Sequence, residues 1–494
     1  MDVAELSARN TLPQAWARVW AERPDAPLVL DACEASPRWC GAAEFDDRTR
    51  RAAARLLAMG LRSGDRMVWS ASASLDAVVA NVGALRAGLV VVPANPLYTA
   101  REMAHVVDDV RPAAVVLDDP ARAGALAGPM AVLDRHLESV TGGRVVRADT
   151  PDGTLDAAAP DVAALVGYTS GTTGAPKGAV LTHGNLLANS EAIARTWRWT
   201  CHDRLVHTLP VFHGHGLCVA LYTSLLVGGS VVLLPRFDVH TVLDARAGHS
   251  ATMFFGVPTM YHRLAASPRV SELAALRLAV SGSAALRADL HGALSAQGGV
   301  DVLERYGMTE TLMTLSNPYD GERRPGTVGF PFPGVEARVD PAGPPGEGGE
   351  LLVRGPAVFA GYWERPAATG AAFDGGWFRT GDLAEVDDGY VRLLGRSTEV
   401  IITGGYNVYP SEVEDVLLTH PGVVEAAVVG LASDEWGEVV CAWVVADGVS
   451  PPNADSILEH AAAGLAPYKR PRQVRFVDAL PRNAMGKVRR SELR

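Results

Sequence analysis

Short apolar runs alternate with longer amphipathic segments over residues 12–160. Residues 46–61 place apolar side chains at helical spacing and have Gly60 near their end, and residues 76–88 repeat a helical pattern. Short β-branched runs typical of buried strands lie between and after them: RMVWSA (66–71), VVVPANP (90–96) and AAVVLDD (113–119). Strands that alternate with helices predict βαβ units and a largely parallel sheet, so the fold class is α/β.

The pattern changes towards the C-terminus. Residues 326–397 predict a small β-rich subdomain with a Pro/Gly-rich turn, and the residues after it predict a compact α/β unit. Ser411 is a candidate N-cap for a helix over 411–420. The expected elements after that helix are strands at 424–431, 441–447 and 474–480 and a helix at 457–466. We therefore expect two domains, residues 1–396 and 397–494.

One uncharged run has the length of a transmembrane helix. Residues 216–235 read GLCVALYTSLLVGGSVVLLP. Gly228, Gly229 and Ser230 interrupt the run, and the residues after them are β-branched and short like a core strand. The pattern therefore favours a buried helix followed by a strand, without a membrane span.

The amino-acid composition disfavours several classes of protein. A chain of 494 residues exceeds what one hydrophobic core usually supports, and a net charge of −11 gives no basic surface for nucleic acid. The five cysteines are scattered without CxxC spacing, which disfavours a disulfide framework and a zinc site. The N-terminus has acidic residues and no apolar segment of a secretory signal. These features predict a cytoplasmic enzyme for small molecules; they leave the oligomeric state open, with a monomer plausible.

The segment YTSGTTGAPKG at 168–178 is the strongest chemical signal. Glycines bring backbone N–H groups close to an anion, and hydroxyls and an ammonium add donors, so the segment predicts a polyphosphate loop. The alternative is an ordinary surface turn, but apolar runs flank the segment on both sides. The P-loop motif is absent, because Gly486-Lys487 is followed by Val488. The candidate phosphate-binding residues are Thr169, Ser170, Gly171, Thr172, Thr173, Gly174 and Lys177.

Residues 169–178 resemble the signature [ST]SG[ST]TGxPKG of the adenylate-forming superfamily, which includes acyl-CoA synthetases, adenylation domains and luciferases. The resemblance implies a large N-terminal domain of layered α/β subdomains and a small mobile C-terminal α/β domain. It also implies ATP, Mg²⁺ and coenzyme A as ligands.

HTLPVFHGHGL at 207–217 contains His213 and His215, two positions apart. An isolated H-x-H is weak support for a metal, and packing in the core is the ordinary role of such residues. The segment resembles the P-x-FHxxG segment of the superfamily. That resemblance implies that His213 lies by the acyl pocket and the pantetheine tunnel as a gate rather than a base.

The stretches 254–264 and 276–286, together with ERYGMTETLM and NPYDGERRPGTVG, resemble malonyl-CoA synthetases. The resemblance implies that Arg263 and Ser283 hold the distal carboxylate, with Met308 in the acyl pocket and Gly282, Ser283 and Ala284 near adenine. The chemistry is consistent, because a buried carboxylate needs a fixed cation and a guanidinium offers two parallel donors. The alternatives are a solvated surface arginine and an apolar pocket for a fatty or aryl acid.

VLERYGMTET at 302–311 contains the aromatic-G-x-TE core of the superfamily. The resemblance implies that Tyr306 and Gly307 contact adenine, Thr309 the α-phosphate and Glu310 a Mg²⁺ ion, which prefers carboxylate and phosphate oxygens. Without the resemblance, the segment could be a turn after a strand in which Thr309 is a cap.

Residues near the C-terminus complete the predicted site. The resemblance assigns the ribose to Asp382 and Arg396, the catalytic role to Lys487 in PRNAMGK, and the CoA contacts to Gly404, Gly405, Lys469 and Arg470. Asp382 in TGD could instead be a turn residue, and a terminal lysine is ordinarily solvated. The superfamily has Lys or Asp at its hinge, where this chain has Thr398.

The predicted activity is an ATP-dependent ligation of malonate or methylmalonate to CoA through an acyl-adenylate, with release of AMP and pyrophosphate. Three alternatives stay open: a ligase for a medium-chain or aryl acid, an enzyme that loads a carrier protein, and a binding protein without activity.

Overall fold

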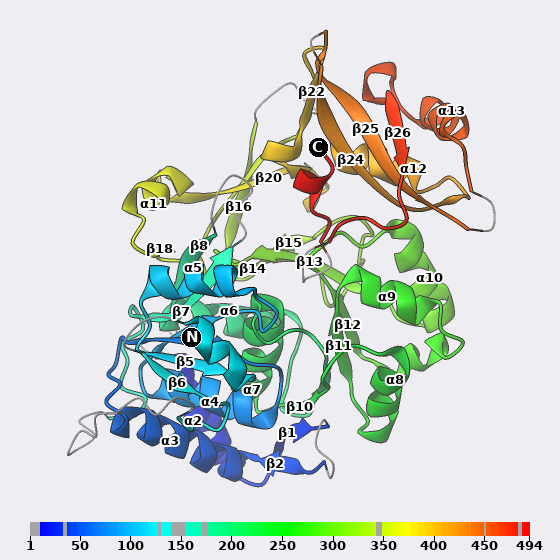
Figure 1. Cartoon of the computed structure of the whole chain (residues 1–494). Helices are drawn as coiled ribbons and strands as arrows, with labels where there is room; N and C mark the ends of the chain where they lie inside the picture. Colours follow the sequence, from blue (N-terminus) through cyan, green and yellow to red (C-terminus); the bar gives the residue numbers. More distant parts are fainter. Residues whose placement is uncertain are drawn as a thin grey trace. The chain divides into compact units, whose positions relative to one another are not determined.

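The computed structural model describes residues 10–32, 37–126, 130–139, 154–169, 176–341, 348–433, 435–448, 451–482 and 487–494. The chain forms two compact units (Figure 1). Unit 1 comprises residues 1–336 and 353–378, and unit 2 comprises residues 337–352 and 379–494. The two units are groups of residues that pack mainly among themselves. The expected domain boundary between residues 396 and 397 stays a prediction.

The first large sheet of unit 1 has nine strands in the order β15-β14-β13-β12-β11-β9-β10-β1-β2. The six strands from β13 to β1 in this order run parallel, and β2, β14 and β15 are antiparallel to their neighbours. Their bounds are β1 Pro27–Asp31, β2 Trp39–Gly41, β9 Arg204–His207, β10 Ser230–Leu233, β11 Met253–Gly256, β12 Leu278–Ser281, β13 Leu303–Met308, β14 Leu312–Ser316 and β15 Phe330–Pro331.

The second large sheet has seven strands in the order β18-β8-β7-β4-β3-β5-β6. The predicted strands at 66–71, 90–96 and 113–119 are confirmed as β3, β4 and β5, which pair in parallel. The bounds are β3 Arg66–Ser70, β4 Val90–Pro93, β5 Ala114–Leu117, β6 Ala131–Leu133, β7 Ala163–Thr169, β8 Lys177–Thr182 and β18 Gly361–Tyr362. Buried valine and leucine side chains on these strands form one core with α5.

Helices cover the sheets, as the alternating pattern predicts. The predicted helices at 46–61 and 76–88 are confirmed as α3 and α4, which pack on each other (Figure 1). The helices of unit 1 include α2 Leu12–Glu22, α3 Ala42–Ala58, α4 Leu75–Arg86, α5 Ala100–Val110, α6 His183–Thr196, η2 His215–Tyr222, α7 Thr223–Val227, α8 Val239–Gly248, α9 Pro258–Ala265, α10 Ala288–Gly298 and α11 Pro366–Ala372.

The uncharged run at 216–235 is a buried helix followed by a strand, as predicted. It forms the π-helical segment η2, the short helix α7 and strand β10, and Gly228 ends α7 with φ +65°. Trp16 and Trp20 of α2 donate their indole N–H groups to the carbonyls of Tyr222 and Leu225, which fixes α2 on this segment. Within the described residues, no helix is long and apolar enough to cross a membrane.

A five-stranded sheet comes next along the chain, with the order β16-β17-β20-β19 and with β21 paired to β20. The predicted β-rich region at 326–397 is thereby confirmed. The bounds are β16 Glu336–Pro341, β17 Gly349–Arg354, β19 Phe373–Asp374, β20 Trp377–Asp387 and β21 Tyr390–Arg396. The division between the two units falls inside strands β16, β17 and β20.

The C-terminal part of unit 2 is the predicted α/β unit. Strands β22 Ile401–Thr403, β23 Tyr406–Val408, β24 Val423–Ser433, β25 Gly437–Ala446 and β26 Gln473–Phe476 form one sheet, packed against helices α12 Pro410–Leu417 and α13 Ala454–Gly464. The N-cap expectation for Ser411 is wrong, because α12 starts one residue earlier at Pro410 with Tyr409 as its cap. The Ser411 hydroxyl instead donates to the carbonyl of Leu394.

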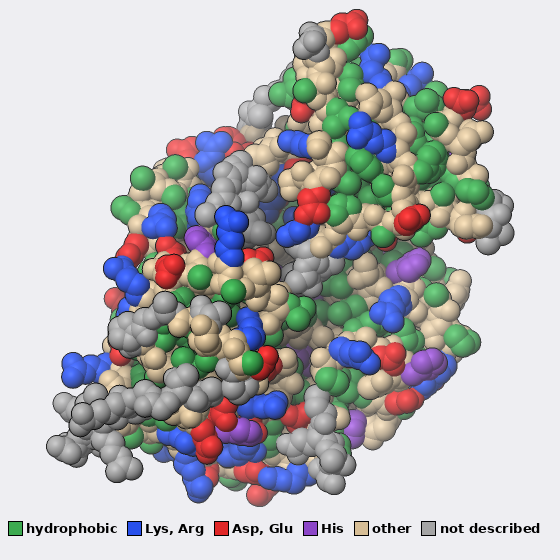
Figure 2. All heavy atoms as spheres, in the orientation of Figure 1, with side chains coloured by type: hydrophobic (Ala, Val, Ile, Leu, Met, Phe, Trp, Pro, Cys, Tyr) green, Lys and Arg blue, Asp and Glu red, His purple; other side chains and the backbone are tan. Residues whose placement is uncertain are grey.

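The distribution of charged side chains on the surface agrees with the net charge, from which no basic surface is expected. Figure 2 shows acidic and basic side chains interspersed over the face drawn, without a large area of one sign. Cys40, Cys201, Cys218 and Cys441 are free thiols.

One buried histidine, His183, is expected to make the free energy of unfolding decrease as the pH falls. His183 is 0% exposed at the start of α6, and neither ring nitrogen has a hydrogen-bond partner in the described part of the chain. Burial lowers its pKa from 6.5 to about 4, so the unfolded chain binds its proton first as the pH falls. We expect the free energy of unfolding to fall by about 1 kcal/mol per pH unit between these values.

Urea denaturation at pH 7 and pH 5 measures this effect. In His183→Leu the loss of stability between the two pH values should be smaller than in the wild type. An equal loss in both proteins would rule out the contribution of His183.

Candidate active site

Four of the predicted motif segments follow the carboxyl ends of neighbouring parallel strands. His207 ends β9, Gly256 ends β11, Ser281 ends β12 and Met308 ends β13, and these strands are adjacent in the order β13-β12-β11-β9. Ligands of open α/β sheets bind at the carboxyl ends of the strands. The fold therefore brings the H-x-H, GVPT, SGSA and YGMTE segments to one edge of one sheet.

The polyphosphate loop joins the two antiparallel strands β7 and β8, and Thr169 pairs with Lys177 at its base. Ser170, Gly171, Thr172, Thr173 and Gly174 lie outside the described residues. Gly167 places this base against the YGMTE segment: a β-carbon at this position would lie 2.5 Å from Cγ2 of Thr309. The start of the loop and Thr309 are thus neighbours, although they belong to different sheets.

Glu310 is buried, with 4% of its surface exposed. Its Oε1 accepts a hydrogen bond of 3.1 Å from the hydroxyl of Tyr362, and Nζ of Lys177 lies 5.1 Å from the centroid of the same tyrosine ring. The turn is tight, because a β-carbon at Gly307 would lie 1.9 Å from the carbonyl oxygen of Leu312. The loop lysine and the acidic residue therefore belong to one cluster.

This cluster fits Mg²⁺ held mainly by substrate. Among the described residues there is no group of three or more His, Cys, Asp or Glu side chains that could hold a metal ion. Mg²⁺ commonly binds one or two carboxylates together with phosphate oxygens and water. Glu310 is the carboxylate that meets this requirement, beside the predicted phosphate loop.

The SGSA segment makes a strained turn. Ser283 has φ +71°, a left-handed conformation that is uncommon for residues other than glycine and that clusters at functional sites. Its hydroxyl lies 3.4 Å from Nδ1 of His215, while Gly282 is buried and Ala284 is exposed. The Tyr306 hydroxyl lies 3.8 Å from Sδ of Met308. The predicted adenine and acyl residues thus surround one turn.

Both histidines of the H-x-H pair are neutral at physiological pH. Burial, and after it the charge of Arg305, lowers the pKa of His213 to about 4 and that of His215 well below its ordinary value. The backbone N–H of His215 donates to Nδ1 of His213 at 3.4 Å. Neutral imidazoles are compatible with the predicted role of His213 as a gate, which stays a prediction.

Arg263 lies on α9 with its side chain exposed. Its guanidinium carbon lies 5.2 Å from the centroid of the Phe237 ring, a cation–π contact. The predicted contact between Arg263 and a distal carboxylate stays a prediction.

Unit 2 holds the predicted ribose residues and the predicted catalytic lysine. Asp382 and Arg396 are register partners on β20 and β21, and their side chains form an ion pair of 2.8 Å. Desolvation by the surrounding protein, followed by the charge of Arg396, lowers the pKa of Lys487, whose side chain still reaches solvent. The charge of Asp382 acts on the same lysine in the opposite direction. The three predicted residues therefore lie within electrostatic range of one another.

The predicted CoA residues occupy two places in unit 2. Gly404 and Gly405, with φ +57° and +84°, form the two-residue turn between β22 and β23. The ammonium of Lys469 bonds to both carboxylate oxygens of Glu412, and Nε of Arg470 donates to the carbonyl of Leu465. Thr398 lies in the short helix η4 Ser397–Glu399. The CoA and hinge assignments stay predictions.

Three residues that the structure places at the site were not assigned to it from the sequence: His215, Arg305 and Tyr362. A signal existed for Arg305, since Glu304 and Arg305 are adjacent charges inside a strand that is otherwise buried. His215 belongs to the H-x-H pair, where only His213 is assigned a role, and Tyr362 gives no local signal; their contacts with Ser283 and Glu310 depend on tertiary structure.

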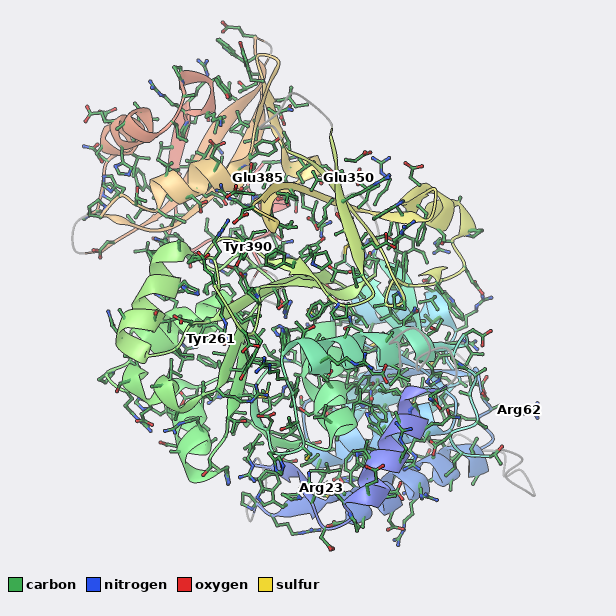
Figure 3. All side chains as sticks on the ribbon, turned by 180° about the vertical axis from the view of Figure 1, so that it is seen from behind. Arg23, Arg62, Tyr261, Glu350, Glu385 and Tyr390 are labelled. Carbon is green, nitrogen blue, oxygen red and sulfur yellow. The ribbon has the colours of Figure 1, made fainter. Side chains whose placement is uncertain are left out.

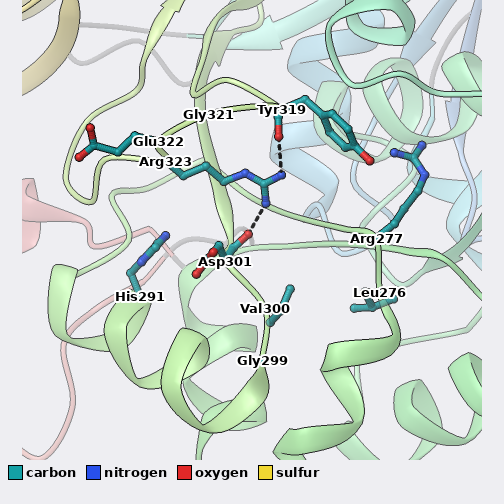
Figure 4. A pocket seen from close by; sticks show the side chains of 10 residues that line it. All are labelled: Leu276, Arg277, His291, Gly299, Val300, Asp301, Tyr319, Gly321, Glu322 and Arg323. Carbon is teal, nitrogen blue, oxygen red and sulfur yellow. Dashed lines mark hydrogen bonds between the residues drawn. The ribbon is translucent and has the colours of Figure 1, made fainter.

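A hollow on unit 1, of about 500 Å³, is lined by Arg277, Tyr319 and Arg323 together with seven further residues (Figure 4). Arg323 donates to the carbonyls of Pro318, Asp301 and Tyr319. Arg277 is paired with Asp203. Because protein oxygens already bind these guanidinium groups and no predicted site residue lines the hollow, it is not the candidate active site.

Comparison with known proteins gives the family. The family model of the AMP-binding enzyme matches residues 16–363, and that of the AMP-binding enzyme C-terminal domain matches residues 412–487. The chain belongs to the AMP-binding enzyme family. The first match contains the phosphate loop and Glu310, and the second contains Lys487.

This AMP-binding enzyme is 38% identical over 465 residues to a feruloyl-CoA synthase of Amycolatopsis, covering 92% of this chain and 93% of that one. It is 36% identical over 482 residues to the mitochondrial malonate–CoA ligase ACSF3 of Mus musculus, covering 88% and 82%. The crystal structure of ATP-bound MatB from Rhodopseudomonas palustris matches with a TM-score of 0.88 and 42% identity over 98% of both chains. The AMP-binding enzyme described here is thus an AMP-forming acid–CoA ligase with the adenylate-forming α/β fold. Adenylate-forming CoA ligases use ATP, Mg²⁺ and CoA.

Proposed function

We propose that the protein forms malonyl-CoA, or methylmalonyl-CoA, from the free dicarboxylic acid, ATP and CoA. The observation that carries this proposal is the polar acyl side of the site, where Ser283 lies against His215 at the end of β12. Nε2 of His215 is buried and has no hydrogen-bond partner within the described residues, and a fatty or aryl acid would leave it so, which costs free energy. The similarity to a malonate–CoA ligase supports the same substrate.

The reaction proceeds in two steps. The substrate carboxylate attacks the α-phosphate of ATP, which forms the acyl-adenylate and releases pyrophosphate. Thr309 contacts the α-phosphate, the loop at 168–178 holds the leaving pyrophosphate, and Lys487 neutralises the charge that develops at phosphorus. Glu310 would hold a Mg²⁺ ion, which would supply positive charge to the phosphate oxygens.

In the second step the thiol of CoA attacks the acyl carbonyl and AMP leaves. Asp382 and Arg396 hold the ribose, and Gly404 and Gly405 line the passage for pantetheine. The C-terminal domain turns about residues near Thr398 between the two steps. No protein nucleophile takes part, because orientation and electrostatic stabilisation supply the rate. We place this chemistry in the cytoplasm.

Pyrophosphate release with malonate, methylmalonate, octanoate and benzoate tests the substrate. We expect kcat/KM to be at least about tenfold higher for the two dicarboxylates, because a site built for a polar group rejects analogues that lack it. Equal or higher activity with benzoate would favour the aryl-acid alternative, which the similarity to a feruloyl-CoA synthase supports. Acyl transfer to a phosphopantetheinylated carrier protein, without transfer to free CoA, would favour the carrier-loading alternative.

A further inference from the structure

Lys487 lies in the last described segment of the chain, residues 487–494, here called the lysine tail. The ends of a chain are poorly ordered unless they are tied to the fold. Two contacts tie the backbone of this tail to unit 2. Val488 pairs with Arg482 in an antiparallel bridge, and Leu493 is 3% exposed in a core cluster with residues of β24 and β25. A charged side chain makes a third contact.

Arg490, three residues after Lys487, makes this third contact. It begins the short helix η6 Arg490–Glu492, and 19% of its side chain is exposed. Nη2 donates to both carboxylate oxygens of Glu414 on α12, at 2.8 and 2.9 Å, and Nη1 lies 3.3 Å from Oε2 of Glu399. One guanidinium therefore bridges two acids that belong to different elements.

Both acids are parts of ordered elements of unit 2. The side chain of Glu414 is 13% exposed, and its Oε1 also accepts the backbone N–H of Val428 on β24 at 2.7 Å. Glu399 ends η4, directly after Thr398, the predicted hinge residue. Strand β21, on which Tyr390 is labelled in Figure 3, leads into η4. Arg490 thus joins the lysine tail to α12 and to the segment that follows β21.

The same charges act on Lys487. Desolvation, and after it the charge of Arg396, lowers the pKa of Lys487, while Glu399 raises this pKa and Arg490 lowers it. Glu399 also acts on the guanidinium of Arg490. Since two cations repel each other, Arg490 does not bind the lysine. It acts on the lysine tail through its ion pairs with the two acids.

We infer that Arg490 is a positioning residue for Lys487: its ion pairs with Glu414 and Glu399 set where the lysine tail lies during formation of the acyl-adenylate. The inference rests on the catalytic role proposed for Lys487. A lysine side chain is flexible, so its ammonium is placed reliably only if its backbone is held. Misplacement by about 1 Å can cost about a hundredfold in rate. The second step does not use Lys487 and should not need these ion pairs.

The test compares the two steps in the wild type, Arg490→Met and Arg490→Lys. The first step is pyrophosphate release with the acid that gives the wild type its highest rate, and the second is thioester formation from a synthetic acyl-adenylate and CoA. In Arg490→Met we expect kcat of the first step to fall about ten- to hundredfold and the second step to change less than about threefold. Arg490→Lys should recover part of the first step, because it keeps the charge but not the planar fork.

Arg489→Met is the matched control. Arg489 is the adjacent arginine of the same tail, and its exposed side chain pairs with Glu492. An exposed ion pair contributes little, so each step should change less than about threefold. A loss in Arg489→Met as large as that in Arg490→Met would overturn the specific role of Arg490.

A double variant tests whether Arg490 acts through Lys487. In Lys487→Ala no ammonium is left to position, so the addition of Arg490→Met should slow the first step by less than about threefold more. Independent contributions would multiply instead. Effects that multiply overturn the inference and leave the role of Lys487 intact. A single Lys487→Ala variant with the wild-type rate of the first step overturns the proposed role of the lysine, and the inference falls with it.

Thermal unfolding separates positioning from stability. Arg490→Met leaves Glu414 buried without its cation, which should lower the unfolding temperature. Arg490→Met/Glu414→Met removes both charges and should unfold near the wild-type temperature, since apolar replacement of a buried ion pair is often neutral or stabilising. Its first step should stay slow. A wild-type rate in this double variant would mean that Arg490 only stabilises the fold, and the inference would be overturned. If neither methionine variant folds, equal loss of both steps in Arg490→Lys overturns it.

Discussion

Replacement of Lys487 by alanine should slow pyrophosphate release from ATP and malonate by about a thousandfold, the upper range for one donor to developing charge. Lys487 lies within electrostatic range of Asp382 and Arg396, to which the family resemblance assigns the ribose. Its ammonium is therefore in position to approach the phosphate next to that sugar. The measurement is the initial rate of pyrophosphate release at saturating substrates.

The neighbouring Arg489→Ala is the matched control. Arg489 is exposed, pairs with Glu492 and lies two residues from Lys487 in the same tail. Its replacement should change the rate less than about threefold. Thioester formation from a synthetic acyl-adenylate and CoA should also survive in Lys487→Ala, and an equal loss in both steps would contradict the assignment of Lys487 to the phosphate.

The second large effect is expected for Glu310→Gln. The amide keeps the size of the side chain and can still accept the hydrogen bond from Tyr362, but it removes the negative charge that would bind Mg²⁺. We expect kcat to fall about a hundred- to thousandfold and the Mg²⁺ concentration for half-maximal rate to rise. A titration of activity with Mg²⁺ measures both quantities.

Tyr362→Phe separates the charge of Glu310 from its orientation. This variant removes the hydroxyl that donates the 3.1 Å hydrogen bond to Oε1 and leaves the carboxylate charge in place, so the rate should fall by about tenfold at most. A Glu310→Gln variant whose Mg²⁺ dependence equals that of the wild type would exclude Glu310 as the metal carboxylate.

The fold could be predicted from the sequence where one local pattern determines the structure. The helices at α3 and α4 and the parallel strands β3, β4 and β5 follow from apolar spacing, and the interrupted run at 216–235 follows from Gly228 and its neighbours. The first residue of α12 could not be fixed in this way. Tyr409, Pro410 and Ser411 all suit the start of a helix, and the bond from Ser411 to Leu394 is a tertiary contact.

The residues of the candidate site likewise fall into two groups, those that could be identified from the sequence and those that could not. The resemblance of short segments to the superfamily identifies Glu310, Asp382 and Lys487 as candidates, because such a resemblance can be recognised without the tertiary structure. The exposure of Arg263 and the burial of Arg305 depend on which side of α9 and β13 faces the interior. A sequence that contains two arginines near the acyl motifs does not show which of them is desolvated.

Because Gly167 lies against Thr309, a side chain at residue 167 would occupy the space that the side chain of residue 309 already fills. A β-carbon at residue 167 and the γ-methyl group of residue 309 would overlap, since they would lie 2.5 Å apart. An alanine at 167 therefore requires a residue without that methyl group, such as serine, at 309. A side chain at residue 167, at the base of the predicted phosphate loop, is consequently compatible only with a change at residue 309, although more than a hundred residues separate the two positions along the chain.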